Sequence, residues 1–301
     1  MHRAHRIPSA LTNNSLDTLK KAWEAYAMGL ENYSQRRKVA PTQSFDVLFD
    51  ISDAATIKQV HDNMLRVYTQ AQDYSEVFSV DVIPVVPKCT PESVKDTTVK
   101  VQYSTPRNED IVRSFGRIQT DFSHSVRRST NDPHEIIYAN HLFEPFRMYE
   151  CVAVGGTFDR LHAGHKMLLT ISALFSSDRL KIGLTSDEMV MGKKYSSLIE
   201  PSVTRLKAVH HFMQKIRPEL RISIDTIHEP VGGTHLTPWL KALVLSTETL
   251  ANGEKINKLR VENGLDPLQI ICIELVNASG DGRGRLCSTS MRSAEHERIS
   301  S

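Results

Sequence analysis

Hydrophobic residues in the second half of the chain form short runs that alternate with segments of helical periodicity. The short runs, several of them almost continuously apolar, predict strands at Cys151–Val154, Arg179–Thr185, Arg221–Ile227, Leu243–Ser246 and Gln269–Leu275. Between them, apolar residues three and four positions apart predict helices at Gly164–Phe175, Val203–Ile216 and Lys255–Asn263. This alternation is typical of a parallel sheet covered by helices on both faces. We therefore expect an α/β fold whose ligand binds beyond the carboxyl ends of the strands.

The first half of the chain shows the same pattern over a shorter length. A helix is expected from about Asp17 to Tyr33, and Phe45–Ile51, Ala54–Gln72 and Val77–Ile83 then follow as strand, helix and strand. This order predicts a smaller α/β domain, in which we find no chemical motif. A polar stretch broken by prolines, from about residue 84 to residue 145, is expected to be a linker. The predicted organisation is an N-terminal region, 1–149, followed by a second domain, 150–301.

Composition narrows the class of protein. The chain has 37 Lys and Arg against 35 Asp and Glu, so its net charge of +2 lacks the basic excess of a dedicated nucleic-acid-binding protein. No apolar run approaches the ~20 residues of a membrane-spanning helix. The four cysteines are scattered without a C-x-x-C pair, which favours a reducing compartment over a disulfide framework or a zinc site. We expect a cytoplasmic protein that binds neither nucleic acid nor membrane.

The segment from Val152 to His165 carries the strongest chemical signal. An apolar run ends at Gly155 and Gly156, and a short polar loop then brings His162 and His165 to the start of the next predicted helix. Glycines let backbone N–H groups approach a phosphate, and a helix N-terminus adds unpaired donors and a favourable dipole. Two histidines with no third ligand nearby leave a zinc site incomplete. The residues therefore predict a phosphate-binding loop and no dedicated metal site in the protein.

Read as G-G-T-F-D-x-x-H-x-G-H, residues 155–165 resemble the signature of the nucleotidyltransferase superfamily related to class I aminoacyl-tRNA synthetases. Further segments resemble phosphopantetheine adenylyltransferase in its archaeal and eukaryotic form: Leu198–Pro201 followed by Arg205, Leu243–Thr249 with Ile256–Gly264, and Ser288–Arg292. The resemblance covers roughly residues 150–295. Residues 1–149 match no family that we can name.

The resemblance implies a Rossmann-like domain that transfers the adenylyl group of ATP to 4′-phosphopantetheine, giving dephospho-coenzyme A and pyrophosphate. It implies that His162 and His165 bind the triphosphate and stabilise charge on the α-phosphate. Thr157 is expected to hold the acceptor phosphate, and Lys193 or Lys194 to neutralise phosphate charge; the sequence does not choose between the two lysines. The further ATP contacts expected are Gly155, Gly156, Phe158, Gly164, Glu248, Arg260, Ser288, Thr289, Ser290 and Arg292.

Some roles stay open at this point. Asp159 is expected either to orient a turn or to bind magnesium through water, and Arg205 is interpreted as an exposed helix cation. Mg²⁺ is implied as the cofactor that accompanies ATP, held mainly by substrate oxygens. The glycine-rich segment Gly280–Gly284 is expected to be a mobile approach to a C-terminal segment that closes over the ATP phosphates.

Other functions remain as alternatives. One is a different member of the superfamily, such as a cytidylyltransferase or a nicotinamide mononucleotide adenylyltransferase. Ser246–Thr249 differs from the R-T-E-G-I-S-T-type motif expected of a cytidylyltransferase. Another is a non-catalytic scaffold that has kept the fold. For the N-terminal region, contact with other enzymes of coenzyme A synthesis is a hypothesis without a motif to support it.

Overall fold

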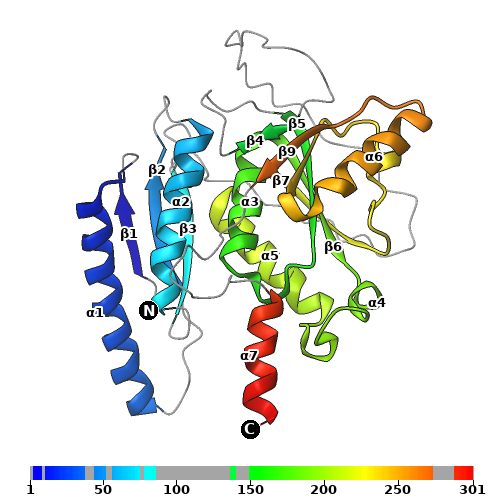
Figure 1. Ribbon diagram of the computed structural model, residues 1–301. Helices are drawn as coiled ribbons and strands as arrows, with labels where there is room; N and C mark the ends of the chain where they lie inside the picture. Colours follow the sequence, from blue (N-terminus) through cyan, green and yellow to red (C-terminus); the bar gives the residue numbers. More distant parts are fainter. Residues whose placement is uncertain are drawn as a thin grey trace.

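The computed structural model contains two sheets, each built of parallel strands, with their connecting helices (Figure 1). The structure describes residues 3–8, 11–37, 44–51, 56–74, 78–85, 136–139, 149–273 and 288–300. The predicted α/β class is confirmed, with a Rossmann-like parallel sheet in the second half of the chain. Most of the expected linker, and Gly280–Gly284, lie outside the described residues. Among the described helices, none is long and apolar enough to cross a membrane.

The smaller sheet has the strand order β1-β2-β3. Its strands are β1 (Arg3–Ile7), β2 (Ser44–Asp50) and β3 (Ser79–Val85), connected by α1 (Asn13–Arg37) and α2 (Ile57–Ala71). The strand β1 was missed by the sequence reading because its residues show no apolar alternation; its pairing with β2 makes it a strand. Pro84, expected at the start of the linker, belongs to β3. Proline has no backbone N–H to donate, and this is tolerated because β3 is an edge strand.

The larger sheet has the strand order β4-β9-β8-β5-β6-β7, and every pairing in it is parallel. Its strands are β4 (Ile137–Tyr138), β5 (Tyr149–Gly156), β6 (Ser176–Thr185), β7 (Arg221–Ile227), β8 (Ala242–Ser246) and β9 (Gln269–Ile273). The main helices are α3 (Ala163–Phe175), α5 (Ser202–Ile216) and α6 (Leu250–Glu262), with the short α4 (Asp187–Val190) and the C-terminal α7 (Ser288–Ser300). Strand β4 lies within the expected linker and pairs with β9, so the larger sheet includes residues that precede residue 150.

Both faces of the larger sheet are covered, as the near-continuous apolar strands predict. Val152 and Val154 of β5 belong to the core that contains α3 and α5, whereas Cys151 and Ala153 belong to a second core with Ile256 of α6. The helix predicted at Lys255–Asn263 begins five residues earlier in the structure, at Leu250. Gly253 lies inside the helix, and a Cβ there would lie 2.5 Å from Cδ1 of Leu245, so any larger residue would require the Leu245 side chain to move where α6 approaches β8.

The chain leaves β5 through α3 towards β6, while β8 pairs with β5 on its other side. Such a reversal of strand order opens a crevice at the carboxyl ends of the two central strands. Those ends carry the glycine loop after β5 and Thr247–Thr249 after β8. The fold therefore places the predicted phosphate loop where a parallel α/β sheet binds its ligand.

The two sheets share one hydrophobic core. Helix α2 contacts α3, and β3 contacts both α3 and α5, which lie between the sheets in Figure 1. Apolar residues of the smaller sheet, such as Val47 and Val82, join the same buried cluster as Leu169 and Met213. The N-terminal region is thus packed against the helices of the larger sheet.

Candidate active site at the carboxyl ends of the strands

The loop after β5 is held in shape by Phe158. This residue has left-handed backbone angles (φ 54°, ψ 31°), which turn its ring back under the strand end. A Cβ on Gly156 would lie 3.0 Å from that ring, so glycine is required there. The ring of Phe158 is fully buried and meets the His165 ring edge-on at 5.4 Å between centroids. The Phe158 side chain is thus a buried support for His165, and its contact with ATP stays a prediction.

The two histidines of the loop stack on each other at the N-terminus of α3. Their ring centroids are 3.9 Å apart with an angle of 25° between the planes. Burial, helped by the neighbouring His162 and Lys193, holds the pKa of His165 well below its ordinary value of 6.5. Its ring is therefore neutral at pH 7, and Nδ1 of His165 is buried without a hydrogen-bond partner among the described residues. A neutral imidazole with one N–H is a hydrogen-bond donor for a phosphate oxygen.

Thr157 and Lys193 form a second pair beside the histidines. The ammonium of Lys193 donates to Oγ1 of Thr157 at 2.6 Å, and the hydroxyl of Thr185 donates to the same oxygen at 3.2 Å. Burial, together with the nearby guanidinium groups of Arg292 and Arg205, lowers the pKa of Lys193. Lys194 lies apart, with its ammonium 4.9 Å from the centroid of the Tyr195 ring. Of the two lysines that the sequence left open, the structure brings Lys193 to Thr157.

Arg205 fixes the backbone at Thr157, next to the Thr157–Lys193 pair. Its side chain is fully buried, so its interpretation as an exposed helix cation is wrong. It donates to the carbonyl oxygens of Thr157 at 2.8 Å and Thr185 at 2.9 Å, and it pairs with Asp187 at 2.8 Å. The pKa of Asp187 is lowered: the hydroxyl of Ser202 and the guanidinium of Arg205 outweigh its partial burial. Arg205 thereby joins the ends of β5 and β6. Helical periodicity alone gave no sign of these long-range contacts.

The C-terminal helix α7 reaches the same loop from more than a hundred residues downstream, as predicted for Ser288–Arg292 (Figure 1). The hydroxyl of Ser288 lies 3.2 Å from Nε2 of His162 and donates to the carbonyl oxygen of Asp159. Arg292 forms a buried ion pair with Asp159 at 2.6 Å and also donates to Thr289. The forked phosphate contact predicted for Arg292 is not what the structure shows, because its nitrogens are bonded within the protein.

Asp159 is the organiser of this contact. Its carboxylate is fully buried and accepts from the backbone N–H of Glu200 at 3.0 Å as well as from Arg160 and Arg292. Glu200 in return accepts from the backbone N–H of Arg160 at 2.8 Å. Of the two roles open for Asp159, these bonds match the orientation of a turn. They also explain why Leu198–Pro201 belongs to the family-like pattern.

The downstream block Leu243–Gly264 divides into two kinds of residue. Glu248 is exposed at the carboxyl end of β8, beside the crevice. Arg260 is buried and donates to the carbonyl oxygens of Thr234, Thr237 and Asp266 at 2.6 to 2.8 Å. These bonds offset the high cost of desolvating a guanidinium and fix the backbone around Arg260, so the ATP contact predicted for Arg260 stays a prediction.

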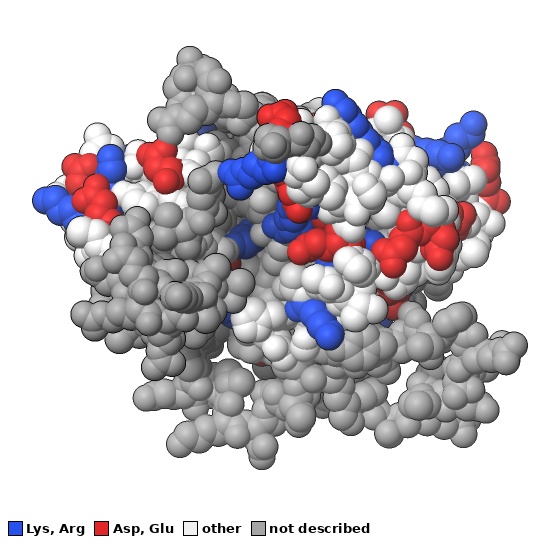
Figure 2. Space-filling view, turned by 90° about the horizontal axis from the view of Figure 1, so that it is seen from below, with Lys and Arg blue, Asp and Glu red and all other residues white. Residues whose placement is uncertain are grey.

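The remaining predicted contacts lie along the same edge. Gly155 is exposed at the end of β5, Gly164 is buried in the first turn of α3, and Thr289 and Ser290 are exposed at the start of α7. Figure 2 shows Lys and Arg side chains near the middle of the face seen from below, with acidic side chains beside them. No cluster of three or more His, Cys, Asp or Glu able to hold a metal ion occurs in the described ranges.

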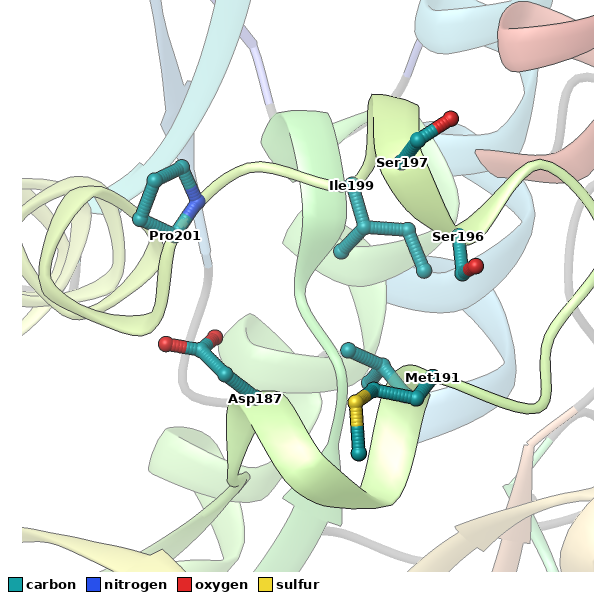
Figure 3. A pocket seen from close by; sticks show the side chains of 7 residues that line it. Asp187, Met191, Ser196, Ser197, Ile199 and Pro201 are labelled. Atoms are coloured by element: carbon teal, nitrogen blue, oxygen red, sulfur yellow. The ribbon is translucent and has the colours of Figure 1, made fainter.

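A cavity of about 340 Å³ lies within the β6–α5 connection, the segment of the chain that also contains Lys193 (Figure 3). It is lined by residues of α4 and of the segment that leads into α5: Asp187, Val190, Met191, Ser196, Ser197, Ile199 and Pro201. No cavity was predicted here: Leu198–Pro201 was noted only as a family-like segment, and it meets α4 only through folding. Asp187, which pairs with Arg205, connects the cavity to the Thr157 backbone.

Comparison with known proteins agrees with this geometry. Residues 153–301 match the model of the Cytidylyltransferase-like family. A phosphopantetheine adenylyltransferase of Pyrococcus furiosus is 41% identical over 132 residues, which make up 44% of this chain and 81% of that protein. The chain belongs to the phosphopantetheine adenylyltransferase family.

Two further proteins are similar to parts of this chain. A phosphopantetheine adenylyltransferase of Saccharomyces cerevisiae is 38% identical over 151 residues, 50% of this chain and 48% of that relative, so this chain matches about half of its length. The crystal structure of a protein of unknown function from Archaeoglobus fulgidus is 30% identical, covers 45% of this chain and 98% of that one, and has a TM-score of 0.38.

Proposed function

We propose that this protein transfers the adenylyl group of ATP to 4′-phosphopantetheine, forming dephospho-coenzyme A and pyrophosphate. One observation carries the proposal: in a member of this family, the stacked pair His162–His165 lies at a helix N-terminus beside the bonded pair Thr157–Lys193. A neutral donor and a cation thus meet at the ligand-binding edge of the sheet. The chain's relatives of that name support the choice of substrates.

The reaction requires positioning and charge stabilisation more than covalent chemistry. A phosphate oxygen of the acceptor attacks the α-phosphorus of ATP, and pyrophosphate leaves in line. Thr157 and Lys193 hold the acceptor phosphate, whose charge also restores the depressed pKa of Lys193. His165, neutral, donates its N–H to an α-phosphate oxygen as charge develops there, and His162 donates to the neighbouring phosphate. The protein needs no nucleophile of its own.

Magnesium enters the proposal only with ATP. Asp159 and Glu200 are the buried or half-buried carboxylates nearest the loop, and both are bonded to backbone N–H groups or to arginine. These residues therefore do not fit a metal site built by the protein. The triphosphate oxygens and water are the ligands of a bound Mg²⁺, which neutralises phosphate charge. Every step above is assigned to residues of the chain.

The acceptor's organic part has a matching space. The cavity is partly apolar, with Val190, Met191 and Ile199 among its lining residues, and it belongs to the same β6–α5 connection as Lys193. Asp187 in the cavity lining pairs with Arg205, which donates to the Thr157 carbonyl oxygen, so we propose that an acceptor whose phosphate rests on Thr157 and Lys193 extends its adjoining chain towards this cavity. This supports an acceptor that carries a flexible, partly apolar arm behind its phosphate.

The experiment is a substrate comparison with purified protein. With MgATP and 4′-phosphopantetheine we expect dephospho-coenzyme A and pyrophosphate in equal amounts. Chromatography measures the first product and a pyrophosphate assay measures the second. CTP with phosphocholine, and ATP with nicotinamide mononucleotide, are the comparison pairs for the other superfamily activities. Turnover with either pair and none with 4′-phosphopantetheine would reject the proposal. Binding of ATP without turnover of any pair would favour a scaffold.

A further inference from the structure

The smaller sheet presents a buried cluster of charges to the helices of the larger one. Two lysines, Lys166 of α3 and Lys215 of α5, enter it from the larger sheet's helices. Their partners come from the first residues of β2 and β3: Ser44 and Asp46, Ser79 and Asp81. The sequence reading found no chemistry in the N-terminal region and passed over this cluster.

The cluster follows from a short pattern that occurs twice, S-F-D at residues 44–46 and S-V-D at residues 79–81. In a strand, side chains two residues apart lie on the same face. The two strands are paired in register, with Ser44 opposite Ser79 and Asp46 opposite Asp81. A row of hydroxyls and a row of carboxylates therefore face the lysines.

Each lysine finds three acceptors, as many as an ammonium has N–H groups. Lys166 contacts Asp81 at 2.7 Å, Ser79 at 2.6 Å and the carbonyl oxygen of Val80 at 2.9 Å. Lys215 contacts Asp81 at 2.6 Å, Asp46 at 3.0 Å and Ser44 at 2.9 Å. The lysines overcome the burial of Asp81 and lower its pKa. Lys166 and Asp81 are buried, whereas Lys215 and Asp46 are half-buried, so removal of a partner should be most damaging at the Lys166–Asp81 pair.

Only one of the two lysines is connected to the candidate active site. Lys166 follows His165 directly, and its backbone N–H donates to the carbonyl oxygen of His162 at 3.0 Å, the first hydrogen bond of α3. Its side chain is anchored in β3, so one residue ties the histidine turn to the smaller sheet. Lys215 makes an equal number of bonds but lies in the last turn of α5.

We propose that Lys166 is a positioning residue, and that the smaller sheet serves through Ser79 and Asp81 to set the orientation of the His162–His165 pair. The proposal rests on the proposed function for its kinetic consequence only. A buried lysine whose backbone and side chain are both fixed leaves the first turn of α3 little freedom. Misplacement of a catalytic group by 1 Å costs up to about 100-fold in rate, so such an anchor has a measurable effect.

The test compares two matched pairs of variants. Lys166→Met and Lys215→Met each remove one ammonium from the cluster, and Ser79→Ala and Ser44→Ala each remove one hydroxyl acceptor while keeping every charge. We expect kcat to fall about 10-fold or more in Lys166→Met and a few-fold in Ser79→Ala, with KM for ATP unchanged. Ser44→Ala should keep kcat within about 2-fold, because within the described part of the chain the hydroxyl of Ser44 bonds only to Lys215. Lys215→Met shares Asp81 with Lys166 but leaves the bonds of Lys166 to Ser79 and Val80 in place, so its loss of kcat should be clearly smaller than that of Lys166→Met.

The second readout does not depend on turnover. The ring Cε1–H resonance of His165, assigned by its absence in His165→Gln, is expected to move in Lys166→Met and Ser79→Ala and to stay in the two control variants. Equal effects of the matched variants on kcat and on this resonance would show that the cluster only holds the sheets together, and the inference fails. If Lys166→Met does not fold, the serine pair decides. If the wild type turns over no 4′-phosphopantetheine, the proposed function is rejected. The inference about Lys166 is then tested by the shift of the His165 resonance alone.

Discussion

Lysines lie both at the amino ends of the strands of the smaller sheet and at the carboxyl ends of the strands of the larger sheet. The two regions differ in whether these lysines are paired with carboxylates. At the first, Lys166 and Lys215 are matched with Asp81 and Asp46. At the second, Lys193 is bonded to a threonine hydroxyl and forms no ion pair within the described part of the chain. Two arginines nearby lower its pKa further. A balanced cluster holds parts of a protein together, whereas an unbalanced cation in a crevice favours an incoming anion.

The largest expected effect comes from the histidine that faces this unbalanced region. His165→Ala should lower kcat by roughly 100- to 1,000-fold, since it removes a donor aimed at the charge that develops on the α-phosphate. Pyrophosphate release measures the rate. His211→Ala, which removes an exposed ring from α5, is the control and should keep the wild-type rate. Full activity in His165→Ala would refute the assigned role of the histidine pair.

A smaller loss is expected from the cation itself. Lys193→Ala should reduce kcat/KM for the acceptor roughly 10- to 100-fold, as expected for the loss of a charge-assisted hydrogen bond. Lys194→Ala should stay within about 3-fold, because its ammonium lies over the Tyr195 ring and away from Thr157. Steady-state kinetics with varied acceptor concentration measures both. If the two variants were equally impaired, the distinction drawn between these lysines would be wrong.

The two buried arginines sharpen the comparison on the side of stability. Arg205→Ala and Arg260→Ala should each lower the free energy of unfolding by about 2–4 kcal/mol, because each leaves buried carbonyl oxygens without a donor. Urea unfolding measures this loss. Only Arg205→Ala should also lower kcat of the folded protein, since its carbonyl partners include Thr157. A comparable loss of kcat in folded Arg260→Ala would favour the predicted ATP contact of Arg260.

The smallest effect concerns pH. The pKa of His165 is below its ordinary value of 6.5, so the unfolded chain takes up this proton more readily than the folded protein does. Stability is therefore lost as pH falls below that ordinary value, and His165→Gln should weaken this part of the decline. Urea unfolding of the wild type and the variant at about pH 7 and about pH 5 measures how much the free energy of unfolding of each falls with pH. An unchanged slope in the variant would mean that another group accounts for the acid sensitivity.

Much of the site was accessible from the residues alone. The glycines after an apolar run and the two histidines before a helical pattern predicted a phosphate loop, because that chemistry is contained within one continuous segment. Lys193 was only half identified, since spacing places two adjacent lysines equally well. Arg205 was wrongly interpreted as exposed, and the internal bonds of Arg260 and Arg292 were not predicted. The reason is common to all three: each bonds to carbonyl or carboxylate groups that are distant in sequence.

The N-terminal region marks the other limit. Its β-α-β order was visible in the periodicity, yet the strand β1 was not, since its pairing with β2 and not its composition makes it extended. The S-x-D pattern of β2 and β3 reads as ordinary strand polarity until the register places the two copies side by side. Only then do the carboxylates meet Lys166 and Lys215.

The sequence by itself determined the α/β class and the family and predicted a phosphate loop, because local periodicity and a contiguous motif contain that information. The tertiary structure alone decided which cations are held by the protein and which remains for a ligand. Charge balance is a sum over groups from separate segments, and burial sets its energetic weight. Neither quantity exists until the chain has folded.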